Sequence, residues 1–316
     1  MFGAWARRIA RVGIGVSAGL GACTSARPAD RSPDRSSTAP PAVAPGTERA
    51  APAEASAARP PAASPVAPPL ASARASPPPA GDAVCPPGAV HVQHDFCPTM
   101  LRRCLHEERD RSNHITICHR FAEGSSDCRA PREALDFCID RHEYPNAPGA
   151  KPAVMTSWHE AARACEARGQ RLCQEREWTA ACEGPAETPF PYGWARSADA
   201  CNLDHAWVSP RLSALHSASR DERDAEVSRL DRSAPSGSRP SCASGFGVLD
   251  LTGNVDEWVR ADRERATERG RWAALKGGAW GHVRNACRPV TTSHAPEWRY
   301  YFVGFRCCAD PSRGAR

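Results

Sequence analysis

Short apolar runs separated by glycine and polar turns dominate the second half of the chain. The clearest covers residues 245–259 and reads GFGVLDLTGNVDEWV. The apolar run at residues 248–251 predicts a buried strand or the edge of a turn. Gly253 ends this run, and Trp258 and Val259 return the chain to an apolar pattern. We therefore expect a tight polar turn with core residues on both sides.

This turn carries three oxygen-bearing side chains, Asn254, Asp256 and Glu257, within four residues. Two interpretations are open. A hard cation such as Ca²⁺ needs several oxygens that converge on one point, and these residues could supply them. Alternatively, the Asn and Asp side chains cap backbone amides of their own loop.

Two segments have the apolar spacing of helices. Ser157 and Glu160 form a capping box, and apolar residues then recur at helical spacing until Gly169. A second helix is predicted over about residues 174–181, with Trp178 on its buried side. The domain should therefore contain two main helices.

The remaining pattern predicts short strands and loops. Strands are expected at residues 89–92 and 137–140, and short apolar pieces alternate with glycine turns from residue 242 onward. Residues 211–239 are charged and serine-rich, which indicates a surface excursion with one short helix at about 224–230. Many short strands with two helices favour an α+β fold over a doubly wound sheet.

The first residues are typical of an export signal. Three arginines precede a short apolar core at residues 12–21, which is too short to cross a bilayer as a helix. The segment at 1–22 ends in Leu-Gly-Ala followed by Cys23, a pattern that resembles a bacterial lipobox. We expect Cys23 to carry a lipid, and the alternative is an ordinary signal peptide with an incidental cysteine.

Residues 23–84 are predicted to form a disordered tether. The part after Cys23 contains 14 of the 30 prolines and no aromatic residue, so it lacks the apolar surface that a core needs. Such a segment would hold a folded domain away from the membrane to which the lipid is attached. No other segment resembles a transmembrane span.

Cysteine content supports export. Of 15 cysteines, 14 lie between Cys85 and Cys308, and no C-x-x-C pair occurs among them. An even number in an oxidising compartment predicts disulfides. The net charge of +5 includes no basic stripe, so nucleic acid is not an expected partner.

Six fragments in order resemble the formylglycine-generating enzyme and sulfatase-modifying factor superfamily: RLCQEREWTAACEG, PYGW, CN, GNVDEW, KGGAW and GFRC. The resemblance covers most of residues 85–310. It implies a single α+β domain related to C-type lectins, with short strands, two main helices, much loop, disulfides and calcium. We place this domain at 85–312, with 85–131 as a Cys-rich segment that leads into it.

The resemblance also implies metal ligands in this chain. The family's GNxxEW turn places Asn254, the Val255 carbonyl and Glu257 around a calcium ion. Asn202 and the Leu203 carbonyl match the start of the family's other calcium site.

The family's catalytic pair is altered here. Its oxidising members resemble one another in a C-x4-C pair that binds copper(I), an ion that prefers sulfur ligands. In this chain the corresponding stretch reads KGGAWGHVRNAC, so the pair becomes His282 and Cys287. Cys287 could instead form a disulfide with Cys308. The family's own disulfide would join Cys165 to Cys307.

Three functions follow from these observations. The first is a non-catalytic binding module, stabilised by calcium and disulfides, that meets a protein, peptide or glycan from a lipid anchor in the bacterial envelope. The second is a copper or non-haem iron oxidase that acts on a cysteine or thiol through His282 and Cys287. The third is a purely structural envelope lipoprotein.

Overall fold

The structure is a computed structural model that describes residues 84–111, 115–262, 272–282 and 284–312. The predicted signal at 1–22, the lipidation site Cys23 and nearly all of the tether lie outside the described residues. Within the described ranges, no helix combines the length and the apolar character that crossing a bilayer requires.

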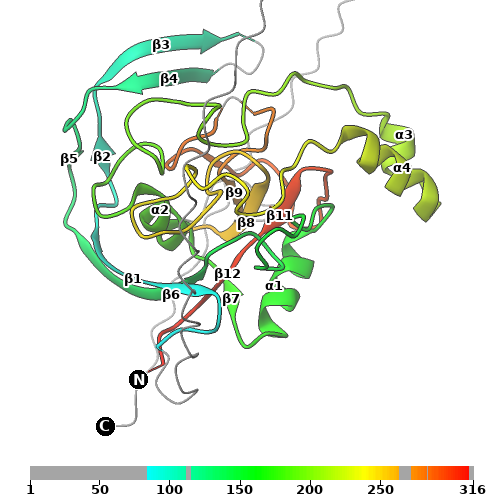
Figure 1. Cartoon of the computed structure of the whole chain (residues 1–316), viewed down its shortest axis with the longest axis horizontal. Helices are drawn as coiled ribbons and strands as arrows, with labels where there is room; N and C mark the ends of the chain where they lie inside the picture. The colour runs from blue at the N-terminus through cyan, green and yellow to red at the C-terminus, as the bar shows by residue number, and fades with distance from the viewer. Residues whose placement is uncertain (1–83, 112–114, 263–271, 283, 313–316) are drawn as a thin grey trace, which may run out of the picture. The chain divides into compact units, whose positions relative to one another are not determined.

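Two four-stranded sheets make up the framework of the domain (Figure 1). The first has the order β1-β6-β12-β7, with β1 Ala89–Phe96, β6 Glu133–Asp140, β12 Cys307–Ala309 and β7 Arg171–Leu172. The second has the order β10-β9-β8-β11, with β10 Val290–Thr291, β9 Ala273–Lys276, β8 Asp256–Arg260 and β11 Val303–Phe305. The fold is α+β, as the sequence predicted.

Strands β1 and β6 are longer than their apolar residues suggest. They pair antiparallel along their whole length, from Ala89 opposite Asp140 to Phe96 opposite Glu133. The prediction covered only four residues of each strand. In β1, polar residues at 93 and 95 point outward while Phe96 returns to the core, so the backbone pairing continues where the apolar run has ended.

The two main helices begin and end close to their predicted bounds. Helix α1, Trp158–Glu166, begins with the Ser157 capping box. It ends three residues before Gly169, because Ala167 already caps it. Helix α2, Glu175–Glu183, ends at Gly184, whose φ of 65° suits glycine.

Two further helices lie side by side in the charged segment (Figure 1). Helix α3, Leu212–Leu215, was not predicted, and α4, Arg220–Leu230, begins earlier than the expected residue 224. The Ser219 hydroxyl accepts a hydrogen bond from the Glu222 amide and so caps α4 at its start. The dense charges of this helix hide its apolar positions in the sequence.

The Cys-rich segment packs onto the rest of the domain. Strands β2, Met100–Leu101, and β5, Asp127–Cys128, form one small ladder, and β3, Cys104–Asp110, and β4, Ile115–Phe121, form a hairpin. The Phe121 amide donates to the Trp194 carbonyl at 2.9 Å, and the Arg196 amide donates to the His119 carbonyl at 2.8 Å. These bonds join the hairpin to the segment that contains PYGW.

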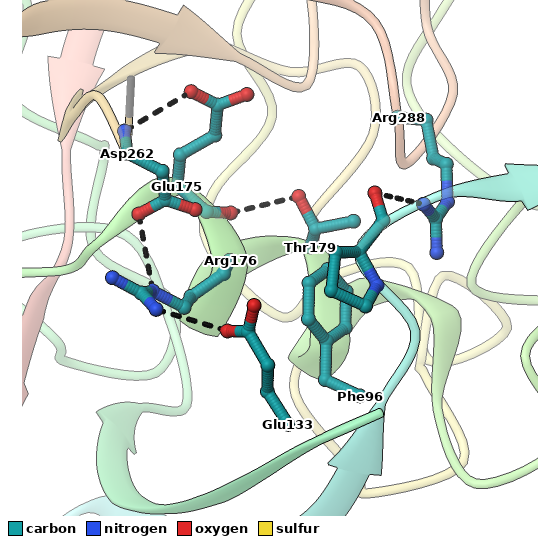
Figure 2. A pocket seen from close by; sticks show the side chains of 8 residues that line it. Phe96, Glu133, Glu175, Arg176, Thr179, Asp262 and Arg288 are labelled. Atoms are coloured by element: carbon teal, nitrogen blue, oxygen red, sulfur yellow. Dashed lines mark hydrogen bonds and ion pairs between the residues drawn. The ribbon is translucent and has the colours of Figure 1, made fainter. Parts of the chain in front are cut away.

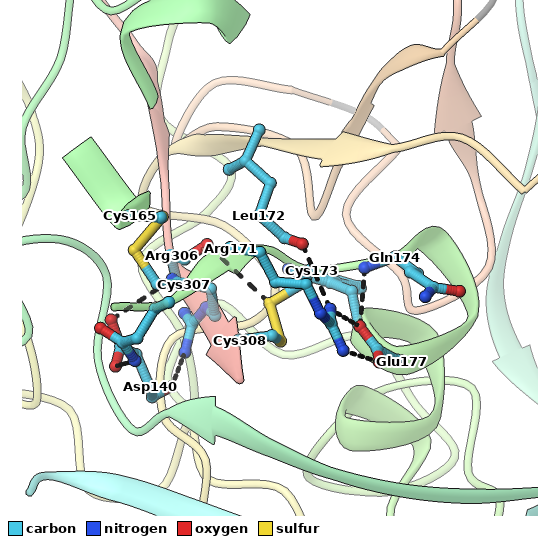
Figure 3. Close-up of a disulfide and its surroundings, with 12 residues drawn as sticks. Asp140, Cys165, Arg171, Leu172, Cys173, Gln174, Glu177, Arg306, Cys307 and Cys308 are labelled. Carbon is cyan, nitrogen blue, oxygen red and sulfur yellow. Dashed lines mark hydrogen bonds and ion pairs between the residues drawn. A yellow bond between two sulfur atoms is a disulfide. The ribbon is translucent and has the colours of Figure 1, made fainter. Parts of the chain in front are cut away.

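Seven disulfides pair all fourteen cysteines between Cys85 and Cys308: 85–138, 97–128, 104–118, 165–307, 173–308, 182–287 and 201–242. The pair implied by the family resemblance, 165–307, is among them, next to 173–308 (Figure 3). This content of disulfides is typical of an exported domain.

Candidate functional site

The turn in GNVDEW is held against a neighbouring loop. Gly253 and Asn254 both have left-handed φ angles, 79° and 55°. A Cβ atom on Gly253 would lie 2.4 Å from the Asn202 carbonyl oxygen, so only glycine fits there. The preceding apolar run is buried at Val248 and Leu251 but forms no strand.

The Asn254 side chain joins three segments. Its Oδ1 accepts from the Ala234 amide at 2.7 Å and from Asn202 Nδ2 at 2.9 Å. Its Nδ2 donates to Glu143 Oε1 at 2.8 Å. The alternative of a loop that caps its own amides is therefore wrong for Asn254, which caps a segment twenty residues away.

The Glu257 carboxylate is fully engaged by protein groups. Arg306 Nε donates to Oε2 and Arg306 Nη2 donates to Oε1, both at 2.7 Å. Trp178 Nε1 also donates to Oε2, at 2.8 Å. Both charged side chains are 1% exposed, so this is a buried bidentate ion pair.

These contacts do not fit the calcium site that the resemblance implied. A calcium ion takes carboxylate and amide oxygens as direct ligands, but here the oxygens of Glu257 and Asn254 already accept hydrogen bonds. The Asn202 amide oxygen is likewise 2.8 Å from His205 Nε2. The described residues contain no group of three or more His, Cys, Asp or Glu side chains placed to hold a metal. Calcium at Asn254, Val255, Glu257, Asn202 and Leu203 stays a prediction.

His282 lies beside a carboxylate of the same turn. Its Nδ1 lies 2.9 Å from Asp256 Oδ2, and the other oxygen, Oδ1, accepts from the Gly278 amide at 2.9 Å. The imidazole also packs edge-on against Phe302, with ring centroids 4.4 Å apart. The sequence analysis considered Asp256 only as part of the turn and missed its contact with His282.

Cys287 has no free thiol in the structure. It is completely buried and is bonded to Cys182 of α2. The suggested partner Cys308 is wrong, because Cys308 forms a disulfide with Cys173, the residue directly after β7. A thiolate is required for copper(I) ligation, so His282 and Cys287 do not form a metal pair in this oxidised form.

A polar pocket of about 330 Å³ lies beside α2 (Figure 2). Arg176 is placed between two carboxylates: its Nη1 donates to Glu133 Oε2 at 2.9 Å, and its Nε lies 3.3 Å from Asp262 Oδ1. Burial raises the pKa of Asp262 to about 6, and Arg176 opposes this rise.

We expect Asp262→Asn to change stability in a pH-dependent way. Because the pKa of Asp262 is raised from 3.8 to about 6, the folded state binds more protons than the unfolded state between these two pH values. The free energy of unfolding of the wild type therefore falls as the pH rises from 3.8 to 6. Above pH 6 the variant should be more stable than the wild type by roughly 1 kcal/mol, a value reduced for solvent screening because Asp262 is partly exposed, and below pH 3.8 the difference should vanish. Urea unfolding at a series of pH values measures this. Asp224→Asn, on exposed α4, is the control that should show no such dependence, and a variant less stable at pH 7 would contradict the prediction.

The fold and the closed cysteine set together define an α+β, disulfide-rich domain of the formylglycine-generating-enzyme type. The chain belongs to the sulfatase-modifying factor enzyme 1-like domain family, whose model matches residues 103–311.

Curated relatives are similar over the same part of the chain. Inactive C-alpha-formylglycine-generating enzyme 2 of Bos taurus is 26% identical over 168 residues, which cover 51% of each chain. Formylglycine-generating enzyme of Mus musculus is 23% identical over 178 residues, 50% of this chain and 44% of that protein. The chain therefore spans about half the length of the curated relatives that it matches.

Two solved structures are similar at lower levels. CarF has a TM-score of 0.45 and 16% identity, over 70% of this chain and 97% of that chain. PvdO from Pseudomonas aeruginosa has a TM-score of 0.43 and 17% identity, over 70% and 94%.

Proposed function

We propose that this domain is a non-catalytic binding or recognition module of its family. The observation that carries the proposal is the disulfide between Cys182 and Cys287, which removes the one cysteine that could have served as a copper ligand. The other position of the family's pair is His282, whose Nδ1 lies 2.9 Å from Asp256 Oδ2. Neither side chain is placed to act on a thiol substrate.

The names of two relatives agree with this proposal. The proteins of Bos taurus and Mus musculus that are 26% identical to this chain are both called inactive formylglycine-generating enzymes. The alternative is a metal-dependent oxidase of a cysteine or thiol substrate. It would require Cys287 to be released from its disulfide and His282 from Asp256.

The proposal includes export and attachment to the bacterial envelope by a lipid on Cys23. Its support is the lipobox-like ending at Cys23 together with the disulfide-rich domain that follows. The tether would allow the module to reach a partner at a distance from the membrane. The mass of the mature N-terminal peptide tests this, because an unmodified Cys23 would contradict lipidation.

A thiol and copper measurement on the native chain tests the absence of catalysis. After alkylation under denaturing, non-reducing conditions, we expect no modified cysteine between Cys85 and Cys308. We also expect no stoichiometric binding of copper(I). Incubation with a cysteine-containing peptide, copper and oxygen should yield no aldehyde.

Cys182→Ala is the matched control, because it frees the Cys287 thiol without changing that residue. This variant should be alkylated once, at Cys287, which shows that the assay detects a released ligand. Aldehyde formed by the native chain, or one equivalent of copper(I) bound by it, would overturn the proposal and support the oxidase.

A further inference from the structure

A cavity of about 190 Å³ lies between the hairpin strand β4 and two loops of the main domain, residues 189–196 and 284–289. Its apolar lining includes Ile117 and Phe121 of β4 and Phe190 of the first loop. Phe121 and Phe190 pack edge to face, with centroids 6.1 Å apart. The hairpin therefore covers a cavity with an apolar floor. Its volume can hold one side chain or a small molecule, and it is smaller than the pockets that bind drug-sized ligands.

Four arginines line the same cavity, Arg102, Arg196, Arg284 and Arg288, and no acidic residue does. Two of them are nearly buried: the side chains of Arg102 and Arg196 are 6% and 5% exposed. Guanidinium groups rarely occur in an apolar cavity without partners. Their pairing therefore decides whether they are structural or available to a ligand.

Arg102 and Arg288 share one carboxylate. Arg102 Nη2 and Arg288 Nε both donate to Glu183 Oε1 at 2.7 Å, and Arg288 Nη2 donates to Oε2 at 2.8 Å. Burial lowers the pKa of Arg102, and the neighbouring Arg288 contributes to this. Glu187 also lies near Arg102, but it is paired with Arg132 through two hydrogen bonds. This side of the cavity therefore keeps one excess positive charge.

The opposite side of the cavity, at Arg196 and Arg284, also carries one excess positive charge. Arg196 is paired with Asp204 and donates to Asn285 Oδ1 at 3.0 Å. Arg284, by contrast, has no hydrogen bond or ion pair with any residue in the described ranges. Arg102 Nη1 likewise donates to none of the described residues. Unused donors therefore remain on both sides of one apolar floor.

We propose that this cavity binds an apolar group that bears a carboxylate, such as a small aromatic acid or the C-terminal residue of a peptide. The apolar floor takes the side chain or ring, and the planar fork of Arg284 takes the carboxylate. A phosphate fits less well, because the cavity offers an apolar body site that inorganic phosphate cannot fill. The inference rests on the proposed binding role, since it names the ligand chemistry of that module.

Titration calorimetry with the full chain tests the ligand class. The small probe is N-acetyl-phenylalanine, compared with its amide and with inorganic phosphate. The peptide probe is a pentapeptide that ends in phenylalanine, compared with its C-terminally amidated form. We expect both acids to bind and each amide to bind at least tenfold more weakly, because the charge-assisted bond is lost. The tighter of the two acids identifies the source of the ligand.

Two variants locate the binding. Arg284→Gln should weaken binding of the acids about tenfold or more, whereas Arg260→Gln, at an exposed position on the end of β8, should leave it unchanged. Thr116→Trp places a large ring at the exposed rim of the cavity and should also weaken binding. Thermal unfolding of each variant confirms that it is folded.

Several outcomes would overturn the inference: no binding by either acid, equal binding of acid and amide, binding of phosphate as tight as that of the acids, or wild-type affinity in Arg284→Gln. None of them bears on the copper and aldehyde measurements. The proposal that this cavity binds a carboxylate can therefore be overturned while the proposal of a non-catalytic module stands, and the reverse also holds.

Discussion

Replacing Arg306 by methionine is expected to lower the free energy of unfolding by about 3–5 kcal/mol, because it leaves the Glu257 carboxylate buried without its counter-charge. The Arg306 guanidinium also donates to the carbonyls of Asp140 and Leu249, at 3.1 and 2.9 Å. The substitution therefore leaves those acceptors unsatisfied as well. Urea unfolding at pH 7, with disulfides intact, measures the loss.

The double variant Arg306→Met/Glu257→Gln separates the lost charge pair from the lost packing. The glutamine oxygen can still accept from Trp178 Nε1, and the orphaned charge at residue 257 is removed. The buried carboxyl groups of Glu143 and Asp250, whose pKa values Arg306 lowers, lose this neighbour equally in the single and the double variant. We expect the double variant to recover more than half of the stability that Arg306→Met loses. A double variant that is less stable than the single one would show that the pair itself, rather than the orphaned carboxylate, controls the effect.

The two disulfides at β12 should lower the free energy of unfolding by unequal amounts when they are removed in succession. Cys165–Cys307 and Cys173–Cys308 join nearly the same two points, and they span 142 and 135 residues. While one remains, removing the other opens a loop of only roughly ten residues, worth about 2–3 kcal/mol in the chain-entropy account. Removing the second then opens a loop of roughly 40 residues, because Cys182–Cys287 still closes the rest of the span, and this is worth about 4 kcal/mol.

The measurement compares the pair of alanine substitutions at 165 and 307, the pair at 173 and 308, and all four together. The order of removal should not matter: whichever disulfide is removed second costs about 1–2 kcal/mol more than the first. Equal and additive losses would contradict the entropic account. Removal of Cys104–Cys118, which spans 14 residues, is the control for an isolated short loop.

The helices could be predicted because their signals are local. The capping box at Ser157 and Glu160 and the glycine at 184 each determine one helix end through contacts within a few residues. The strands of the first sheet could be located but not bounded, because polar residues on the outward face of β1 carry no apolar signal. Helix α4 was underestimated for a related reason, since Glu226 is buried in a helix whose charges suggested a fully solvated face.

The site could be located but not interpreted from sequence. The GNVDEW turn and the stretch from 276 to 287 lie together through the contact between Asp256 and His282. What the sequence could not supply were the long-range partners. Arg306 lies 49 residues from Glu257, and Cys182 lies 105 residues from Cys287. These two contacts place the Glu257 carboxylate in a buried ion pair and Cys287 in a disulfide whose partner the sequence did not identify.

The adjacent disulfides at Cys307 and Cys308 also affect how this domain would respond to proteases outside the cell. Any single peptide-bond cleavage between residues 174 and 306 leaves two fragments that Cys165 and Cys173 still hold to β12. On a denaturing gel the cleaved chain would migrate as one band without reductant and would separate into two fragments after reduction. The segments within this span, which include the two cavity loops at 189–196 and 284–289 and helices α3 and α4, can therefore be cut or altered in length while the two halves stay covalently joined.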